Sequence, residues 1–103
     1  MLISRERLDM GQRRAYVIEY PWLNETEVIT ILSVSVADED ADGIFSVEQA
    51  TINIGGKDIR FIADAGTGDN DGTEYVVTIN VTTNEGQVNN DCVRFLVSCD
   101  GCC

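Results

Sequence analysis

The chain has no histidine among its 103 residues, a single proline and a single tryptophan. Histidine is the side chain that most often acts as a general base near neutral pH, and it is a common metal ligand. Its absence leaves the serines without the base that would activate them as nucleophiles. The many carboxylates lie in segments expected to be solvated turns, so they indicate no glycosidase pair. We therefore expect a protein that is not an enzyme.

Cysteine is absent from the first 91 residues, so no disulfide can join distant parts of a core. All four cysteines lie near the end of the sequence, at Cys92, Cys99, Cys102 and Cys103. They allow more than one pairing within a chain, and thiols on a terminal segment can also bond to another molecule. We expect disulfides here, with Cys92 paired locally and the remaining thiols reaching a neighbouring subunit.

The spacing Cys99-x-x-Cys102 leaves two alternatives open, a redox pair and a zinc site. A redox pair needs a helix N-terminus to lower the thiol pKa, whereas this motif follows a predicted strand. A zinc site would have to use Cys102 and Cys103, which are adjacent and poorly placed to bind one tetrahedral ion. Bonding between thiols is therefore favoured.

Basic residues are few: seven lysines and arginines stand against 18 acidic residues, for a formal net charge of −11 at pH 7. Such a surface repels nucleic acid and anionic membranes, so neither is expected as a partner. Arg5, Arg7, Arg13 and Arg14 nevertheless gather near the start of the sequence. We expect residues 1–12 to form an extended arm, and these arginines to dock on the acidic body of another copy or subunit.

Long apolar runs are also missing. Met1-Leu2-Ile3 is followed directly by charged residues, unlike a secretory signal, and no stretch reaches transmembrane length. We expect synthesis in a cytoplasm, where thiols stay reduced until the product leaves that compartment.

The alternation of apolar and polar residues predicts strands and turns, without a helix. The pattern includes an irregularity near Gln49 and a hairpin turn at Gly55-Gly56. Short strands at this spacing are typical of an antiparallel β-sandwich. The predicted strands cover 13–20, 28–36, 44–54, 58–63, 73–83 and 88–98.

One local pattern favours an immunoglobulin-like (Ig-like) sandwich. Asp71 lies four residues before Tyr75, which opens the most regular of the predicted strands. This arrangement matches the tyrosine corner, in which the phenol hydroxyl bonds to backbone upstream. We predict an all-β chain with a single antiparallel Ig-like sandwich over residues 13–98, the arm before it and a short Cys-rich tail at 99–103.

An acidic turn supports an alternative function. Asp38-x-Asp40-x-Asp42-Gly matches the opening of an EF-hand calcium loop. The pattern then fails, because position twelve is Gln49 and the acid Glu48 comes one residue early; a solvated turn is the other interpretation. Together with the acidic loop at 64–72, this turn suggests a calcium- or glycan-binding module. Otherwise no cofactor is expected.

Two segments carry a family resemblance. Residues 16–29 (YVIEYPWLNETEVI) resemble a segment that opens many small virion proteins of tailed bacteriophages, and residues 72–86 (GTEYVVTINVTTNEG) resemble their closing strand and turn. The resemblance implies a non-enzymatic structural component of a phage particle, such as a head decoration, a neck or collar protein, or a tail subunit. It implies a location in the virion, after synthesis in the host cytoplasm. The implied partners are further copies and capsid, neck or tail proteins, and Trp22 with Leu23 would close one end of the sandwich.

Overall fold

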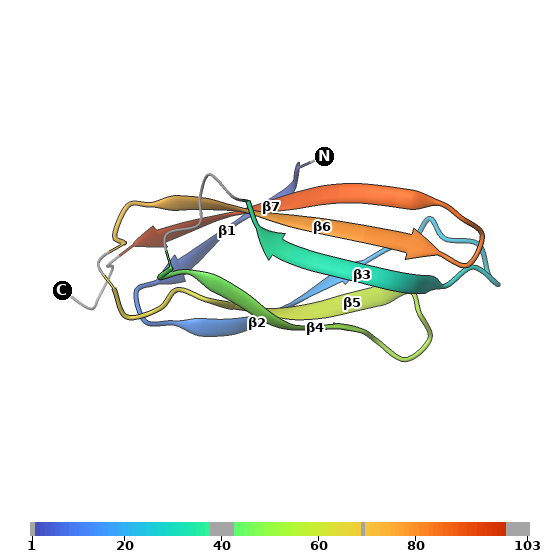
Figure 1. Ribbon diagram of the computed structural model, residues 1–103, viewed down its shortest axis with the longest axis horizontal. Helices are drawn as coiled ribbons and strands as arrows, with labels where there is room; N and C mark the ends of the chain where they lie inside the picture. Colours follow the sequence, from blue (N-terminus) through green and yellow to red (C-terminus); the bar gives the residue numbers. More distant parts are fainter. Residues whose placement is uncertain (1, 38–42, 69, 99–103) are drawn as a thin grey trace.

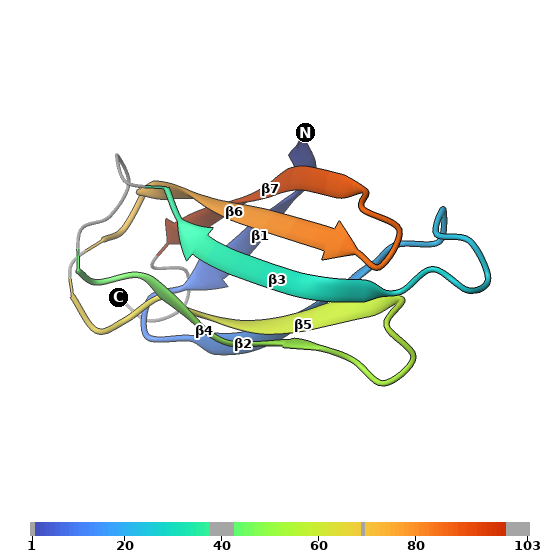
Figure 2. The same ribbon diagram turned by 45° about the vertical axis from the view of Figure 1, so that its right-hand side comes forward.

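The computed structural model describes residues 2–37, 43–68 and 70–98, which form seven strands and no helix. The strands build two layers that face each other (Figures 1 and 2), a four-stranded sheet in the order β1-β7-β6-β3 and a three-stranded sheet in the order β2-β5-β4. The predicted all-β class and β-sandwich architecture are confirmed. The strand bounds are β1 (Leu2–Asp9), β2 (Arg13–Glu19), β3 (Ile29–Val36), β4 (Ser46–Ile52), β5 (Asp58–Asp64), β6 (Glu74–Thr83) and β7 (Val88–Ser98).

Six of these strands lie close to the predicted ranges, and the predicted irregularity is present in β4. The pairing of β4 with β5 shifts register between Glu48 and Thr51. Gln49, inside this shift, has a positive φ of 54°, which is uncommon for a residue with a side chain. The extra residue of a β-bulge accounts for both features.

The hairpin between β4 and β5 requires glycine at position 56. Gly56 has a φ of +70°, and a Cβ placed on it would lie 2.6 Å from the Cβ of Val28. Its carbonyl accepts a hydrogen bond of 2.9 Å from the Ile29 amide. The hairpin therefore packs directly against the start of β3, in a backbone conformation that suits a residue without a side chain.

The first strand differs from the expectation in two respects. Leu2–Asp9 takes the place of the expected arm over residues 1–12, because it forms an edge strand of the four-stranded sheet. It pairs with β7 in parallel, so this sheet is mixed rather than antiparallel. The charges in this segment concealed the strand: an edge strand needs only one buried face, and here the fully buried Leu8 provides it.

The core lies between the inner faces of the two sheets. Phe95 on β7 stands at its centre, with ring contacts to Tyr16 at 5.1 Å, Phe45 at 5.5 Å and Phe61 at 6.3 Å. Burial of each large apolar side chain contributes about 1.5–3 kcal/mol. The predicted inner face of β6 is confirmed, since its members are at most 1% exposed: Tyr75, Val77, Ile79 and Val81.

Tyr75 is tied to the loop before β6. Its ring stacks on Phe45 with centroids 4.5 Å apart. Its hydroxyl accepts a hydrogen bond of 3.1 Å from Asn70 Nδ2, which also donates to the Ala65 carbonyl at 2.9 Å. The sequence pattern singled out Tyr75 and Asp71, whereas the side chain that bridges Tyr75 to Ala65 is Asn70.

The loops after β2, β4 and β6 meet at one end of the sandwich. Glu27 is only 1% exposed, and its Oε2 accepts a hydrogen bond of 2.6 Å from the Thr83 hydroxyl. Its Oε1 accepts longer bonds of 3.4 Å from the Asn24 amide and from Gln87 Nε2. Lys57 Nζ donates to the carbonyls of Asn24 and Glu27. These polar contacts hold the three loops together.

Trp22 and Leu23 lie at the same end but differ in burial. Leu23 packs against the core, while Trp22 is 49% exposed and contacts the ring of Tyr20 edge to face, with centroids 6.0 Å apart. Of the two residues expected to close this end, only Leu23 is packed inward.

Candidate docking surface

Two of the four N-terminal arginines lie on the outer face of the four-stranded sheet. Successive side chains of a strand point to opposite faces, so the burial of Leu8 on β1 directs Arg5 and Arg7 outward. The parallel register sets Arg5 opposite Arg94 and Arg7 opposite Leu96. Strand β7 thereby adds a third arginine to this face.

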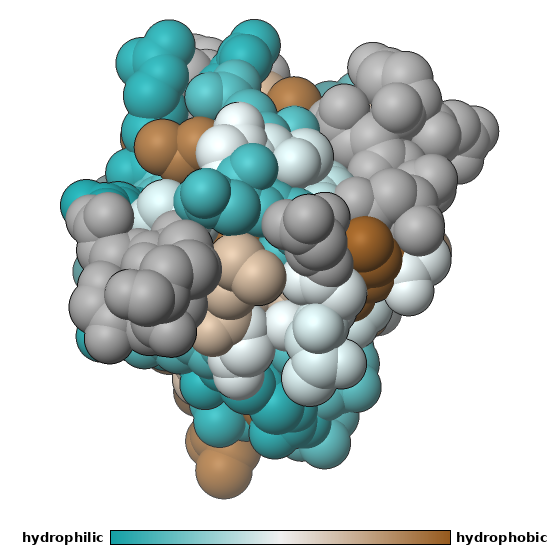
Figure 3. All heavy atoms as spheres, turned by 90° about the vertical axis from the view of Figure 1, so that its left-hand side faces the viewer, coloured by the Kyte–Doolittle hydropathy of each residue, from teal (hydrophilic) through white to brown (hydrophobic). Residues whose placement is uncertain are grey.

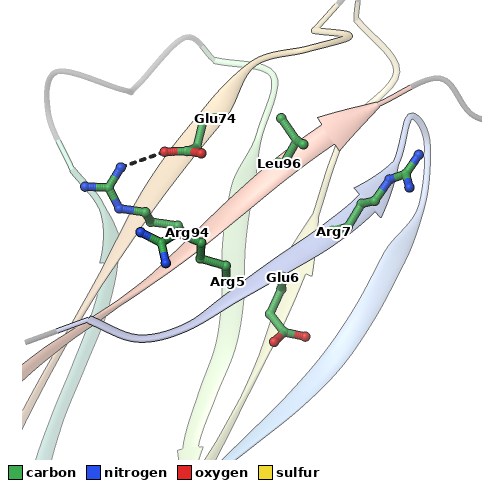
Figure 4. A pocket seen from close by; sticks show the side chains of 6 residues that line it. All are labelled: Arg5, Glu6, Arg7, Glu74, Arg94 and Leu96. Atoms are coloured by element: carbon green, nitrogen blue, oxygen red, sulfur yellow. Dashed lines mark hydrogen bonds and ion pairs between the residues drawn. The ribbon is translucent and has the colours of Figure 1, made fainter.

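These side chains surround an open depression of about 240 Å³. Figure 4 shows Arg5 and Arg94 side by side, with Glu6 pointing to the opposite side of β1. The depression is lined by Arg5, Glu6, Arg7, Glu74, Arg94 and Leu96. We call Arg5, Arg7 and Arg94 together the arginine surface.

Glu74 compensates part of the positive charge on the arginine surface. Arg94 Nη1 lies 2.6 Å from Glu74 Oε1, with both side chains more than 40% exposed, and Arg7 Nε donates to Ser98 Oγ at 2.9 Å. Arg5 has no ion-pair partner in the described part of the chain. Like charges opposite each other on neighbouring strands are destabilising, and an exposed ion pair stabilises by at most about 1 kcal/mol. The arrangement is therefore better suited to an incoming anionic group than to fold stability.

The other two arginines are directed elsewhere. The turn after β1 carries the chain to the three-stranded sheet, where Arg13 Nε lies 2.7 Å from Glu48 Oε1 and 3.8 Å from Asp64 Oδ2. Arg14 lies near the hydroxyl of Tyr16; burial raises the pKa of Tyr16, and the Arg14 guanidinium opposes that rise. The four arginines expected to act together thus fall on two sheets, and carboxylates already neutralise Arg13.

Cys92 shares the outer face with the arginine surface. It lies between the buried Asp91 and Val93 on β7, so its side chain points outward, and it is partly exposed. Its thiol is free in the described part of the chain. The other expected disulfide partners, Cys99, Cys102 and Cys103, lie outside the described residues, as does the expected calcium turn with Asp38, Asp40 and Asp42.

The described portion of the second acidic loop shows how its first carboxylate is used. Asp64 Oδ1 accepts a hydrogen bond of 2.8 Å from the Gly66 amide, and the same carboxylate faces Arg13. Across residues 2–37, 43–68 and 70–98, no three potential ligands gather as a metal site would require. Figure 3 looks onto the end of the sandwich that carries the loop after β5, where teal and white surface is interrupted by separate hydrophobic spots. The structure also contains no helix able to span a membrane within those ranges.

Sequence patterns did not single out Arg94. A signal was available, because Arg94 lies between the apolar Val93 and Phe95 of an alternating strand and so had to face outward. Its neighbours Arg5 and Arg7 could not be inferred, since they belong to a strand at the other end of the sequence.

Comparison with known proteins gives a likeness of fold only. No family model matches the chain, and no curated protein matches it. Among solved structures, the chain is similar to a 2,6-sialyltransferase of Photobacterium sp. JT-ISH-224, crystallised with CMP and lactose. The TM-score is 0.56 and the sequence identity 17%, over 95% of this chain and 17% of the sialyltransferase chain. The chain thus spans about a sixth of that enzyme, and the two share an overall fold over this part.

Proposed function

We propose that this chain is a non-enzymatic, Ig-like structural subunit that docks on neighbouring subunits of a phage particle. The arginine surface is the observation that carries the proposal, because it gathers three arginines in one area of a chain whose net charge is −11. The acidic remainder of a second copy, or another acidic subunit, would be electrostatically complementary to it. Such complementarity sets the orientation of docking and speeds association.

The strand order supports the Ig-like part of the proposal. In Ig domains the second, fifth and fourth strands share one sheet, and the third, sixth and seventh share the other. Here β2-β5-β4 and β3-β6-β7 divide in the same way. Tyr75 near the start of β6, joined to the preceding loop through Asn70, fits the tyrosine corner. The first strand pairs with β7 in this chain, whereas in constant-type Ig domains it lies in the other sheet.

The phage context rests on the resemblance of residues 16–29 and 72–86 to virion proteins, which suggests a head, neck or tail position. In this proposal the C-terminal cysteines lock docked subunits by disulfides after the particle leaves the reducing cytoplasm. The partly exposed Cys92 on the docking face supports that role. Non-reducing electrophoresis of purified particles should show bands larger than the monomer that disappear with reductant. Monomer alone would contradict the disulfide part of the proposal.

Charge reversal tests docking through the arginine surface. We expect Arg5→Glu/Arg94→Glu to weaken self-association by about tenfold or more in sedimentation velocity, a loss of about 1.4 kcal/mol. The matched control is Arg14→Glu/Arg60→Glu, which changes the net charge equally on the other sheet. Added salt should weaken association of the wild-type chain. A wild-type chain that stays monomeric up to its solubility limit, with and without reductant, would overturn the proposed self-docking.

A further inference from the structure

We infer that copies of this chain join head to tail, with β1 of one copy pairing with the open edge of β3 in the next. The four-stranded sheet would then continue across molecules. The inference rests on the proposed self-association and names its interface.

Strand β3 is an edge with unusually little protection. Natural edge strands avoid unwanted pairing through charges, prolines or short length. β3 has eight residues, ITILSVSV, with no proline, and it is the only strand of the described chain without a charged residue. Ile31 on its outer face is 62% exposed. This edge is suited to receive another strand by β-augmentation.

Backbone groups are available along this edge. The Ala37 amide donates to the Val76 carbonyl at 2.9 Å, so the backbone N–H and C=O groups of Ala37 point toward β6. In an antiparallel ladder this direction alternates from one residue to the next. The backbone N–H and C=O groups of Leu32, Val34 and Val36 therefore point away from β6. Strand β4 lies near β3 but belongs to the other sheet and forms no ladder with it.

Strand β1 forms the opposite edge of the same sheet and matches β3 in length and direction. It also has eight residues. β1 runs parallel to β7, β7 antiparallel to β6, and β6 antiparallel to β3, so β1 and β3 point the same way (Figure 1). Continuing the sheet into a second copy therefore brings β1 against β3 as a parallel pair.

The outward side chains of the two edges are compatible. β1 is regular from Ser4 onward, after a register shift between Leu2 and Ser4, so the alignment uses its outward residues Arg5 and Arg7. We align Ser33 with Arg5 of the next copy, which places Ser35 beside Arg7. The pairing thus sets no like charges against each other.

Charge also favours β1 over a second β3 as the occupant. The exposed Glu25 precedes β3 in the sequence, and β3 itself has no charged residue. A second β3 strand would therefore bring no positive charge to this region. β1 instead presents Arg5 and Arg7. Because β1 and β3 are different edges, the contact is heterologous and generates an open chain or a ring rather than a closed dimer.

Substitutions at Ser33 test this pairing by the sign of the charge they introduce. Sedimentation velocity in reductant excludes disulfides, and circular dichroism checks the fold of each variant. Ser33→Lys, placed beside Arg5 of the next copy, should weaken association by about tenfold or more, whereas Ser33→Asp should retain or strengthen it. Ser46→Lys on the exposed edge strand β4 is the matched control and should leave association unchanged. Ser33→Lys combined with Arg5→Glu should associate more strongly than either single variant, because the two positions then carry opposite charges.

The outcomes separate this inference from the proposed function. If the wild-type chain associates but Ser33→Lys and Ser33→Asp behave alike, the β1–β3 interface is wrong while self-docking stands. A dimer that does not grow with concentration also overturns it, because a heterologous contact does not close at two copies. A wild-type chain that is monomeric at every concentration overturns both.

Discussion

Replacing Leu8 with alanine tests whether the first strand is an integral part of the sandwich. The Leu8 side chain is 0% exposed, while Arg7 and Asp9 beside it are not buried, so Leu8 is the main apolar anchor near the end of β1. Removing three buried carbon groups at about 0.8 kcal/mol each loses about 2.4 kcal/mol before any cavity term. Leucine-to-alanine changes in cores cost about 2–5 kcal/mol. Because an edge strand can shift inward, we expect about 2.5–3.5 kcal/mol.

Thermal and urea unfolding followed by circular dichroism measure this loss, at low protein concentration so that association does not contribute. The Tm should fall by roughly 10–20 °C. Ile3→Ala is the matched control on the same strand, because Ile3 is 40% exposed, and it should cost less than about 1 kcal/mol. Small and equal losses for both variants would refute the placement of β1 in the sheet and favour an arm instead.

Three further predictions concern buried polar groups. Burial raises the pKa of Tyr20 from 10.0 to about 12, so the folded state favours the neutral phenol and the protein loses stability as the pH rises from about 10 to 12. Tyr20→Phe should reduce this loss of stability at alkaline pH, measured by urea titration. An unchanged pH dependence would show that Tyr20 is not its cause. Burial also raises the pKa of Asp91, so the folded state favours the protonated carboxyl. The contribution of Asp91 to the free energy of unfolding is therefore complete below about pH 3.8 and is lost as the pH rises through the pKa of the folded state. Asp91→Asn should therefore raise the Tm at neutral pH, and a lower Tm would contradict this reasoning. Glu27→Ala should destabilise the fold by about 1–3 kcal/mol, because the buried Thr83 hydroxyl loses its hydrogen-bond acceptor. Glu25→Ala, at an exposed position, should change the stability by less than about 0.5 kcal/mol. Equal effects of the two variants in denaturant titrations would contradict a stabilising role for Glu27.

Much of the sandwich could be predicted because strand signals are local. The alternation over 73–83 and 88–98 set the inner faces of β6 and β7, and these faces are buried as expected. Glycines located the hairpin after β4, and the disturbed pattern near Gln49 located the bulge. Each of these features depends on residues within a few positions of one another.

Strand β1 could not be predicted in the same way. Its sequence, LISRERLD, contains four charged residues, which resembles a solvated segment. Its hydrogen bonds come from β7, at the other end of the chain, and a parallel partner leaves no hairpin signal between the two strands. The expected arm was a reasonable interpretation of composition that tertiary pairing overrode.

The candidate site shows a similar division. Composition revealed that Arg5, Arg7, Arg13 and Arg14 were unusual on an acidic chain. The crossing between sheets after β1 separated them into two pairs, and only the first pair joined Arg94. These side chains are close in the sequence but lie on different sheets, because the consecutive strands β1 and β2 belong to different layers.

By itself, the sequence determined the all-β class, the approximate ranges of six strands, the lack of histidine and the acidic net charge. These follow from composition and from the two-residue period of strands, which act locally. The tertiary structure decided that Leu2–Asp9 is a strand, that it lies parallel to β7, and that Arg5 and Arg7 meet Arg94. These features depend on contacts such as Arg7 to Ser98, 91 positions apart in the chain, and the folded sheet alone brings such residues together.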